Sequence, residues 1–400
     1  MPGYIRRRGR SSWEISVRCG WDPARNRYVR VTRTVRGDRK TAERELAKLL
    51  HEVHTGGYVD PARITVKEFL EKFLRDYVAS SVSPRTGERY REIIRDYIVP
   101  RIGSVPLHRL RPLHIQDLYT QLMSSGRRRG EGGLSAATVR KVHVVLHRAF
   151  NLARRWGLLG TNPCDGVTPP RVEIPEICPP DPEEVRRILE ATKDTRLFAP
   201  TALAAILGLR RGEVLALKWS DVDLDSGTIS ITRALEQTRA GIRMKDLKSA
   251  KARRMLPLPS LAAEVLRAHR RHQASERLRA GPDWEDNDLV FPDPTGRPWS
   301  PQAFTHAFER AMRGAGIKVR FHDLRHHVGT TLLKGGVDVK TVSTVLGHST
   351  PTVTLNTYAH TIRAAQQEAL DRLDRILRSC GLAAVWRQLP SSEGTPGVGG

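Results

Sequence analysis

Short alternating segments and one helical segment characterise the first fifty or so residues. Apolar and polar residues alternate over Ser12–Cys19 and over Arg27–Val35, which predicts two half-buried strands. Turn-forming residues lie between them: Gly20, Asp22, Pro23 and Asn26. Apolar residues then recur at helical spacing from Arg39 to His54, just before two glycines. We therefore expect residues 4–54 to form a small separate unit.

Helical spacing dominates from Thr65 to about Pro170. Four apolar stripes mark four helices: Phe69, Phe73 and Tyr77; Tyr90, Ile94, Tyr97 and Ile98; Ile115, Leu118, Tyr119 and Leu122; Val139, Val142, Leu146, Phe150 and Ala153. The segment 126–133 is rich in Gly and Arg, so we expect a mobile basic loop there. Prolines between residues 168 and 180 predict a stiff, extended connector to the next domain.

A second large domain begins at Asp181, where a helix start carries acidic residues in its first turn. The pattern predicts helices over 183–192 and 197–207, followed by strands over Thr228–Thr232, near Ile242–Lys245 and over Arg254–Leu258. Helical spacing returns and continues to about Arg378. Residues 379–400 are rich in Ser, Gly and Pro near their end, and we expect them to be disordered.

The charge balance narrows the classes of partner. The formal net charge is +24, and a surface that basic attracts polyanions such as a phosphate backbone. A solvated basic surface with no such partner is the alternative. Residues 1–48 hold 14 Lys and Arg against 5 Asp and Glu, so the predicted N-terminal strands could lie in a DNA groove or serve only as a solubilising appendage.

Other features exclude several classes of protein. No run of about 18 apolar residues exists, which argues against a membrane span, and the basic N-terminus lacks the apolar stretch of a secretory signal. The four cysteines are scattered without metal-ligand spacing, which argues against disulfides and structural zinc: Cys19, Cys164, Cys178 and Cys380. A reducing cytoplasm fits this use of cysteine.

Basic and hydroxyl residues occur in a fixed order in the last 200 residues. Each one alone has an ordinary explanation as a solvated or packing residue. The ordered set is Arg210, Lys248, His322, Arg325, His348 and Tyr358. Glu213 follows the first arginine at i+3, and a helix-ending glycine precedes His348.

This set resembles the tyrosine recombinase, or phage integrase, family. The matching strings are Gly-Leu-Arg210-Arg-Gly-Glu213, Leu-Lys248-Ser-Ala-Lys-Ala-Arg-Arg-Met-Leu-Pro-Leu, His322-Asp-Leu-Arg325-His326, Leu-Gly-His348-Ser and Asn-Thr-Tyr358-Ala-His. The chain departs from the family pattern at Leu207, where Thr is usual, and at Ala252 and Met255, where small hydroxyl residues are usual. None of these is a reacting group, so we interpret them as packing variation.

The resemblance implies a mainly α fold with small β elements. Residues 1–57 resemble an arm-type DNA-binding domain, a three-stranded sheet with one helix. Residues 64–170 resemble the helical, SAM-like core-binding domain, and residues 180–378 the mixed α/β catalytic domain.

The chemistry of phosphodiester attack explains the residue types. The transition state carries extra negative charge on the non-bridging oxygens, and two guanidinium groups, Arg210 and Arg325, can hold them. By resemblance, Tyr358 is the nucleophile that forms a 3′-phosphotyrosyl bond, and Lys248 is the general acid for the leaving 5′ oxygen. The remaining roles implied by the resemblance are proton transfer on the tyrosine side for His322, a hydrogen bond to the phosphate for His348, and orientation of neighbours for Glu213.

The resemblance also implies the partners. We expect double-stranded DNA with core-type and arm-type sites, a homotetramer that docks through the amphipathic segment Ala364–Leu377, and an excisionase or DNA-bending protein as a possible accessory. No cofactor, metal or ATP is expected, because no carboxylate cluster or phosphate-binding Gly-rich loop accompanies the motifs. The expected place of action is the prokaryotic cytoplasm, at the nucleoid.

Two alternatives stay open. Type IB topoisomerases use a similar set of residues to relax DNA without exchanging partners, but the basic N-terminal unit and the helix beyond Tyr358 favour recombination. A DNA-binding regulator that has lost catalysis is the second alternative, and the presence of every catalytic residue type argues against it.

Overall fold

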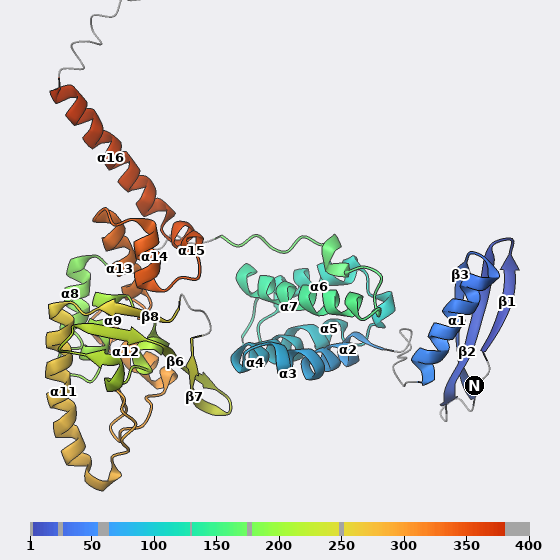
Figure 1. The fold of residues 1–400 in the computed structure, drawn as a ribbon, viewed down its shortest axis with the longest axis horizontal. Coiled ribbons are helices and arrows are strands. Elements are labelled where there is room, and N and C mark those ends of the chain that lie inside the picture. Colours follow the sequence, from blue (N-terminus) through green and yellow to red (C-terminus); the bar gives the residue numbers. More distant parts are fainter. Residues whose placement is uncertain are drawn as a thin grey trace, which may run out of the picture. The chain divides into compact units, whose positions relative to one another are not determined.

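The computed structural model describes residues 3–22, 27–54, 64–128, 130–173, 178–247 and 252–380. The chain divides into two compact units, residues 1–174 and 175–400. Most of the described residues are helical, and the strands form small sheets of two or three strands (Figure 1). This confirms the predicted mainly α class with small β elements.

The N-terminal part of the first unit is a three-stranded antiparallel sheet covered by one helix. Strands β1 (Gly3–Gly9), β2 (Ser12–Asp22) and β3 (Arg27–Arg36) pair in chain order, and α1 (Arg39–His54) packs on them. Ile15 and Val17 from β2 meet Ala42 and Leu49 from α1 in a small buried core. The alternating pattern predicted β2, β3 and α1. The pattern did not predict β1, because its sequence Gly-Tyr-Ile-Arg-Arg-Arg-Gly shows little apolar alternation.

The rest of the first unit is helical. Its elements are α2 (Val66–Lys72), η1 (Phe73–Val78), α3 (Ala79–Ser81), α4 (Pro84–Ile93), η2 (Ile94–Ile98), α5 (Val99–Ile102), η3 (Leu107–Arg109), α6 (Pro112–Ser125), α7 (Ala136–Arg155) and η4 (Pro163–Gly166). The apolar stripes read from the sequence are the buried faces of these helices, with Phe69, Phe73, Tyr119 and Phe150 among the largest buried side chains. Ser83 and Ser135 cap the starts of α4 and α7, where each side chain accepts from a backbone N–H of the first turn.

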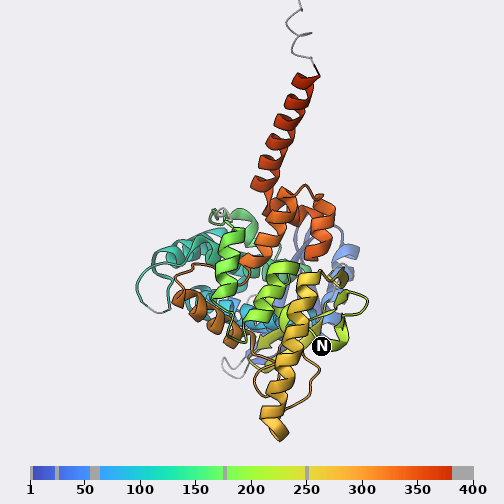
Figure 2. The same ribbon diagram turned by 90° about the vertical axis from the view of Figure 1, so that its left-hand side faces the viewer.

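The second unit surrounds a larger core. Its helices are α8 (Pro182–Glu190), α9 (Phe198–Leu207), α10 (Arg211–Leu215), η5 (Trp219–Asp221), α11 (Ser260–Ala280), η6 (Gly281–Asp283), α12 (Pro301–Gly314), α13 (Asp323–Lys334), α14 (Val339–Leu346), α15 (Pro351–Thr357) and α16 (Ala359–Ser379). Phe291, Phe304, Phe308 and Leu324 lie in the centre of this core. Two ribbon views show α16 running out from α13 and α15, which its residues contact (Figures 1 and 2).

Two small sheets accompany these helices. Strands β4 (Val222–Asp223), β5 (Thr228–Ile231) and β8 (Arg254–Pro257) form an antiparallel sheet, and β6 (Arg233–Thr238) with β7 (Gly241–Asp246) forms a hairpin. The sequence pattern predicted β5, β7 and β8 but missed β4 and β6. Disorder was predicted for residues 379–400. Ser379 is instead the last residue of α16, and residues 381–400 lie outside the described residues.

Among the helices that the structure describes, we find none with the length and apolar character needed to cross a membrane.

Candidate active site

Arg210 is placed by a sharp change of direction between two helices. Gly208 ends α9 in the left-handed conformation (φ 64°), and Arg210 then occupies the N-cap position of α10. A Cβ atom at Gly208 would lie 2.6 Å from Leu346, so only glycine fits this close approach. The Arg210 guanidinium donates to Glu213 Oε1 (2.7 Å) and to the carbonyl oxygen of Gly347 (3.0 Å).

Glu213 is a buried carboxylate held between two arginines. Its side chain accepts from Arg210 and from Arg254 Nη2, which lies 3.0 Å from Oε2. Burial alone would raise the pKa of Glu213, but Arg254 and Arg210 outweigh it and lower that pKa. Glu213 is therefore ionised at neutral pH and fixes both guanidinium groups.

Arg325 comes from α13 and is 2% exposed. Its Nη1 donates to the carbonyl oxygen of Gly208 (2.8 Å), whereas its buried Nη2 has no hydrogen-bond partner in the described part of the chain. Burial and the nearby Arg210 charge lower the pKa of Arg325 to about 9. A buried donor without a partner is costly, so this part of the site is built to receive an acceptor.

His348 directly follows the left-handed Gly347 that ends α14, as the sequence predicted. Its Nδ1 lies 2.7 Å from the Thr354 hydroxyl oxygen, so the imidazole is anchored on one side. Burial, followed by the charges of Arg325 and Arg210, lowers the pKa of His348 to about 4. The ring is therefore neutral at physiological pH.

Tyr358 lies between α15 and α16, with its ring turned into a small apolar cluster of the second unit. The side chain is 4% exposed and packs with Val328, Leu333 and Leu346. Its hydroxyl group has two long contacts, to the carbonyl oxygen of Arg325 (3.5 Å) and to His326 Nδ1 (3.4 Å). Burial, opposed by the charge of Arg325, raises the pKa of Tyr358 to about 12.

A glycine makes room for this position of the tyrosine. Gly329 lies in the middle of α13, where a Cβ atom would come within 2.9 Å of Tyr358 Cε2 and closer still to Cζ and the hydroxyl oxygen. The Tyr358 side chain therefore packs against the face of α13 that carries Gly329, and we call this its stored position.

His326 separates His322 from the tyrosine. The rings of His322 and His326 meet edge to face with centroids 4.9 Å apart, and His326 lies 5.9 Å from the Tyr358 ring. Burial, with further contributions from His326, Arg325 and Arg210, lowers the pKa of His322 to about 4. The sequence motif assigned proton transfer to His322, but the histidine that contacts the tyrosine hydroxyl is His326.

The lysine predicted to be the general acid, Lys248, lies outside the described residues, as does Lys251. The neighbouring Lys245 in β7 pairs with the buried Glu236 (3.0 Å). In the sequence, Lys248 and Lys251 lie between the end of β7 at Asp246 and the start of β8 at Arg254.

The pockets formed by the described residues of the second unit include two of about 400 Å³ or more. One, of about 400 Å³, has Arg210, Arg211, Arg320 and His322 in its lining. Within the described part of the chain we find no group of three or more His, Cys, Asp or Glu side chains that could hold a metal ion. The arrangement near Arg210 and Arg325 suits a phosphate group, because guanidinium groups bind such oxygens in pairs.

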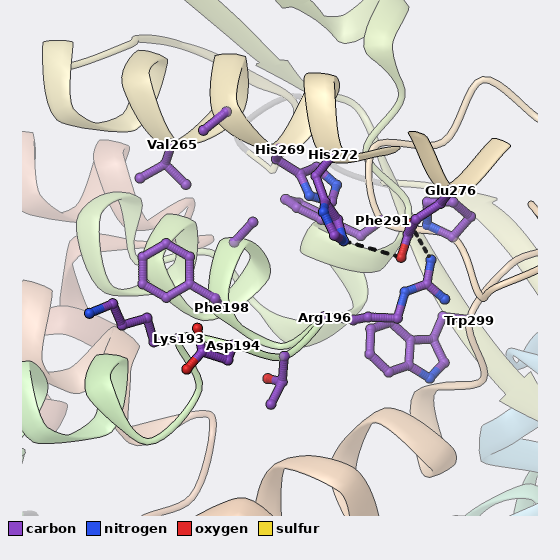
Figure 3. A pocket seen from close by; sticks show the side chains of 14 residues that line it. Lys193, Asp194, Arg196, Phe198, Val265, His269, His272, Glu276, Phe291 and Trp299 are labelled. Carbon is purple, nitrogen blue, oxygen red and sulfur yellow. Dashed lines mark hydrogen bonds and ion pairs between the residues drawn. The ribbon is translucent and has the colours of Figure 1, made fainter. Parts of the chain in front are cut away.

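The other pocket, of about 440 Å³, lies between α11 and the start of α9 (Figure 3). Arg196 forms an ion pair with Glu276 (2.9 Å) there, and Trp299 and Phe291 contribute to its wall. Its lining includes none of the predicted site residues that the structure describes.

Comparison with known families accounts for this geometry. Residues 181–364 match the phage integrase family, and residues 65–123 match the phage integrase N-terminal SAM-like domain. The chain belongs to the phage integrase family. It is therefore a tyrosine recombinase, which confirms the family and the class of enzyme expected from the ordered motifs.

Relatives of the family cover most of the chain. A tyrosine recombinase XerC-like protein of Caldanaerobacter subterraneus subsp. tengcongensis is 29% identical over 381 residues, which cover 87% of this chain and 96% of that protein. The Tn1549 transposon integrase in complex with a circular intermediate DNA has a similar fold (TM-score 0.65, 18% identity, 78% of this chain and 99% of that one). The lambda integrase tetramer bound to a Holliday junction is also similar (TM-score 0.54, 18% identity, 88% and 97%).

Three residues that contribute to this integrase site were not singled out by sequence reasoning. They are Arg254, His326 and Gly329. A signal existed for Arg254: in a strand whose Leu256 and Leu258 point inward, period-two alternation places Arg254 on the same buried side.

Proposed function

We propose that this chain is a site-specific integrase that cuts and rejoins DNA strands through a 3′-phosphotyrosyl intermediate on Tyr358. It would integrate a mobile element and excise it in the reverse direction. The observation that carries the proposal is the unpartnered, buried Nη2 of Arg325 beside Arg210 and Tyr358. A scissile phosphate gives that donor an acceptor and satisfies the site.

The cleavage step follows from these groups. The Tyr358 oxygen attacks phosphorus and forms a new P–O bond, while the bond from phosphorus to the 5′ oxygen breaks. Arg210 and Arg325 hold the non-bridging oxygens as their negative charge increases. Lys248 supplies the proton to the leaving 5′ oxygen, and the tyrosine proton leaves toward His326, which contacts the hydroxyl group, and His322 beside it. Attack by a second 5′-hydroxyl group reverses the step and joins the new strand.

His348 and Glu213 have different roles near the phosphate. The Nδ1 of His348 is engaged by Thr354, so Nε2 is the ring nitrogen left to donate to a phosphate oxygen. Glu213 does not contact the substrate, because it is buried behind the two arginines.

The stored position of Tyr358 adds a step before chemistry. A buried hydroxyl with a pKa of about 12 is a poor nucleophile, and it contacts the carbonyl of Arg325 rather than an open site. The segment α15–Tyr358–α16 must therefore shift so that the hydroxyl leaves Gly329 and reaches the phosphate.

The remaining parts of the chain provide the DNA contacts in this proposal. Residues 1–57 bind arm-type sites, residues 64–170 bind core-type sites together with the catalytic domain 180–378, and an excisionase or DNA-bending protein assists. Because the substrate is chromosomal DNA, the enzyme acts in the prokaryotic cytoplasm at the nucleoid.

Assembly into a tetramer would use α16. Large apolar side chains are exposed along its second half: Leu370, Leu373, Ile376 and Leu377. Such a stripe on one helix face is typical of a helix that packs on a partner. We propose that it docks on a neighbouring copy, in line with the tetramer of the structurally similar lambda integrase.

A trapping experiment tests the proposal. Purified protein is incubated with nicked duplexes from the sequences that flank its own gene, and the covalent adduct is digested and mapped. DNA should be attached to Tyr358 alone, and Tyr358→Phe should bind the same duplex and form no adduct. Attachment to another residue, or adduct formation by Tyr358→Phe, would overturn the mechanism.

A further inference from the structure

Arg254 is a buried arginine that uses three sides of its guanidinium group. It is the first residue of β8, and its side chain is 4% exposed. Nε donates to the carbonyl oxygen of Val345 (2.9 Å), Nη1 to that of Ala252 (3.2 Å), and Nη2 to Glu213 Oε2 (3.0 Å). A buried charge is tolerated when it is paired and hydrogen-bonded in this way.

Each partner of Arg254 belongs to a different segment of the proposed active site. The Glu213 carboxylate accepts from the guanidinium group of Arg210 (2.7 Å) and from the backbone N–H of Arg210 (3.1 Å). Val345 lies in the last turn of α14, three residues before His348. Ala252 directly follows residues 248–251, the segment that contains Lys248.

Gly347 closes these contacts into a ring. Its backbone is left-handed (φ 63°), and a Cβ atom there would lie 2.6 Å from Arg254 Nη1. Its carbonyl oxygen accepts from Arg210 Nη2 at 3.0 Å. The chain just before His348 is therefore held between Arg254 on one side and Arg210 on the other.

We propose that Arg254 is a positioning residue that sets the places of Arg210 and His348 relative to one another. This inference rests on the proposed function of those two residues. Arg254 is too deeply buried to contact DNA, so it acts only through the groups that it holds. Lysine cannot replace it, because a single ammonium point charge does not span three acceptors in fixed directions.

The alternative is that Arg254 only stabilises the core. Arg196→Lys provides a matched control, because Arg196 is also part-buried in the second unit, pairs with a carboxylate (Glu276) and donates to a backbone carbonyl (Asp293). Arg196 lines the pocket of Figure 3, and the lining of that pocket includes none of Arg210, Glu213, Arg254 and Gly347. Arg254→Lys and Arg196→Lys make the same chemical change, and only the first is expected to alter the reaction.

The test uses the full chain at saturating concentration with a nicked duplex from the sequences that flank the gene. We measure the single-turnover rate constant of adduct formation, the dissociation constant for the duplex and the melting temperature. Arg254→Lys should slow adduct formation by about 100-fold, the loss caused by displacing a reacting group by about 1 Å. DNA affinity should stay within about threefold, because the phosphate contacts are made elsewhere. Arg196→Lys should keep the wild-type rate.

Two outcomes would overturn the inference. One is a rate for folded Arg254→Lys that matches Arg196→Lys once each is corrected for its folded fraction. The other comes from Glu213→Gln, which keeps the side-chain shape and provides a test if Arg254→Lys does not fold. A rate of adduct formation for Glu213→Gln within about threefold of wild type would mean that the contacts of Glu213 with Arg254 and Arg210 do not position the site. Loss of a charge-assisted hydrogen bond to a buried group should have a larger effect. Failure of the wild-type chain to form any adduct would instead refute the proposed function.

Discussion

Replacement of Gly329 by alanine tests whether Tyr358, the proposed nucleophile, packs against α13 in its stored position. In the middle of an exposed helix, Gly→Ala stabilises by about 1 kcal/mol, because alanine has the higher helix propensity. Here the new Cβ atom would come within 2.9 Å of Tyr358 Cε2 and closer to Cζ and the hydroxyl oxygen. The tyrosine ring or α13 must therefore move.

The structure sets the size of this effect. Forcing extra volume into a packed site costs about 1–3 kcal/mol. Complete expulsion of the tyrosine would cost more, since burial of an aromatic side chain of about 150 Å² or more is worth roughly 4 kcal/mol at 25 cal/mol per Å². The protein should respond in the way that costs less, which is local rearrangement of the packed site. After the gain in helix propensity is subtracted, Gly329→Ala should lower the free energy of unfolding by about 0–2 kcal/mol. Without the contact with Tyr358, the same change would be a gain of about 1 kcal/mol.

A double-mutant cycle separates the two cases. Thermal unfolding is measured for wild type, Gly329→Ala, Tyr358→Ala and the double variant, together with hydrogen exchange in peptides from α13. The expected coupling is about 1–3 kcal/mol, and each kcal/mol corresponds to about 2–4 °C for a domain of 150–250 residues. Tyr358→Phe is the internal control: its ring keeps the Cζ and Cε2 contacts, so the coupling with Gly329→Ala should persist in the Phe background and vanish in the Ala background.

The sign of the single change is decisive. A more stable Gly329→Ala protein with no coupling to Tyr358→Ala would refute the stored tyrosine. The proposal that α15 and α16 must shift before cleavage would then lose its basis.

Three further predictions concern chemistry, pH and partners. Lys248→Ala should slow cleavage of normal DNA but spare a substrate with a 5′-bridging sulfur, whose leaving group needs no proton; the same rescue in Lys251→Ala instead would mean that the general acid is Lys251. The pKa of His348 is about 4 in the folded chain against 6.5 unperturbed, so the unfolded chain gains a proton that the folded chain refuses as pH falls from 6.5 to 4. The melting temperature should fall across that window, and less steeply in His348→Asn. Deletion of residues 1–57 should leave core-site cleavage intact and reduce integration, with a salt-dependent loss of affinity, and equal integration by the truncated protein would contradict the arm-type assignment.

Helix ends were the most predictable part of the fold. A helix ending at Leu346 before Gly347, one opening at Pro351 and one closing at Gly335 follow from residues with strong backbone preferences. These local signals also place Arg210 and His348, because Arg210 comes two residues after the left-handed Gly208 and His348 directly follows the left-handed Gly347. The full set of site residues, by contrast, was implied by the family resemblance.

Other features depend on packing between distant segments, which a linear pattern does not encode. Gly329 reads as a weak point in a helix until the ring of Tyr358, 29 positions later, is seen to lie on it. In the sequence, His326 is only the last residue of a motif. In the structure its Nδ1 lies 3.4 Å from the Tyr358 hydroxyl oxygen, and in the described part of the chain we find no such contact for another histidine. The family resemblance implied a third N-terminal strand, but the apolar pattern did not reveal β1, since a run of three arginines hides the alternation of a strand that pairs along one edge only.

In the proposed function, the burial of Tyr358 has a consequence for DNA that is not a target site. A basic protein spends most of its time on DNA that is not its target, because such sites outnumber the specific ones by many orders of magnitude. A protomer in the described conformation that meets an arbitrary phosphate brings Arg210 and Arg325 to it, but its Tyr358 side chain is buried against Gly329 of α13. Such encounters leave the strand whole. In this proposal the enzyme does not cleave DNA until α15 and α16 have shifted and Tyr358 has left its buried position.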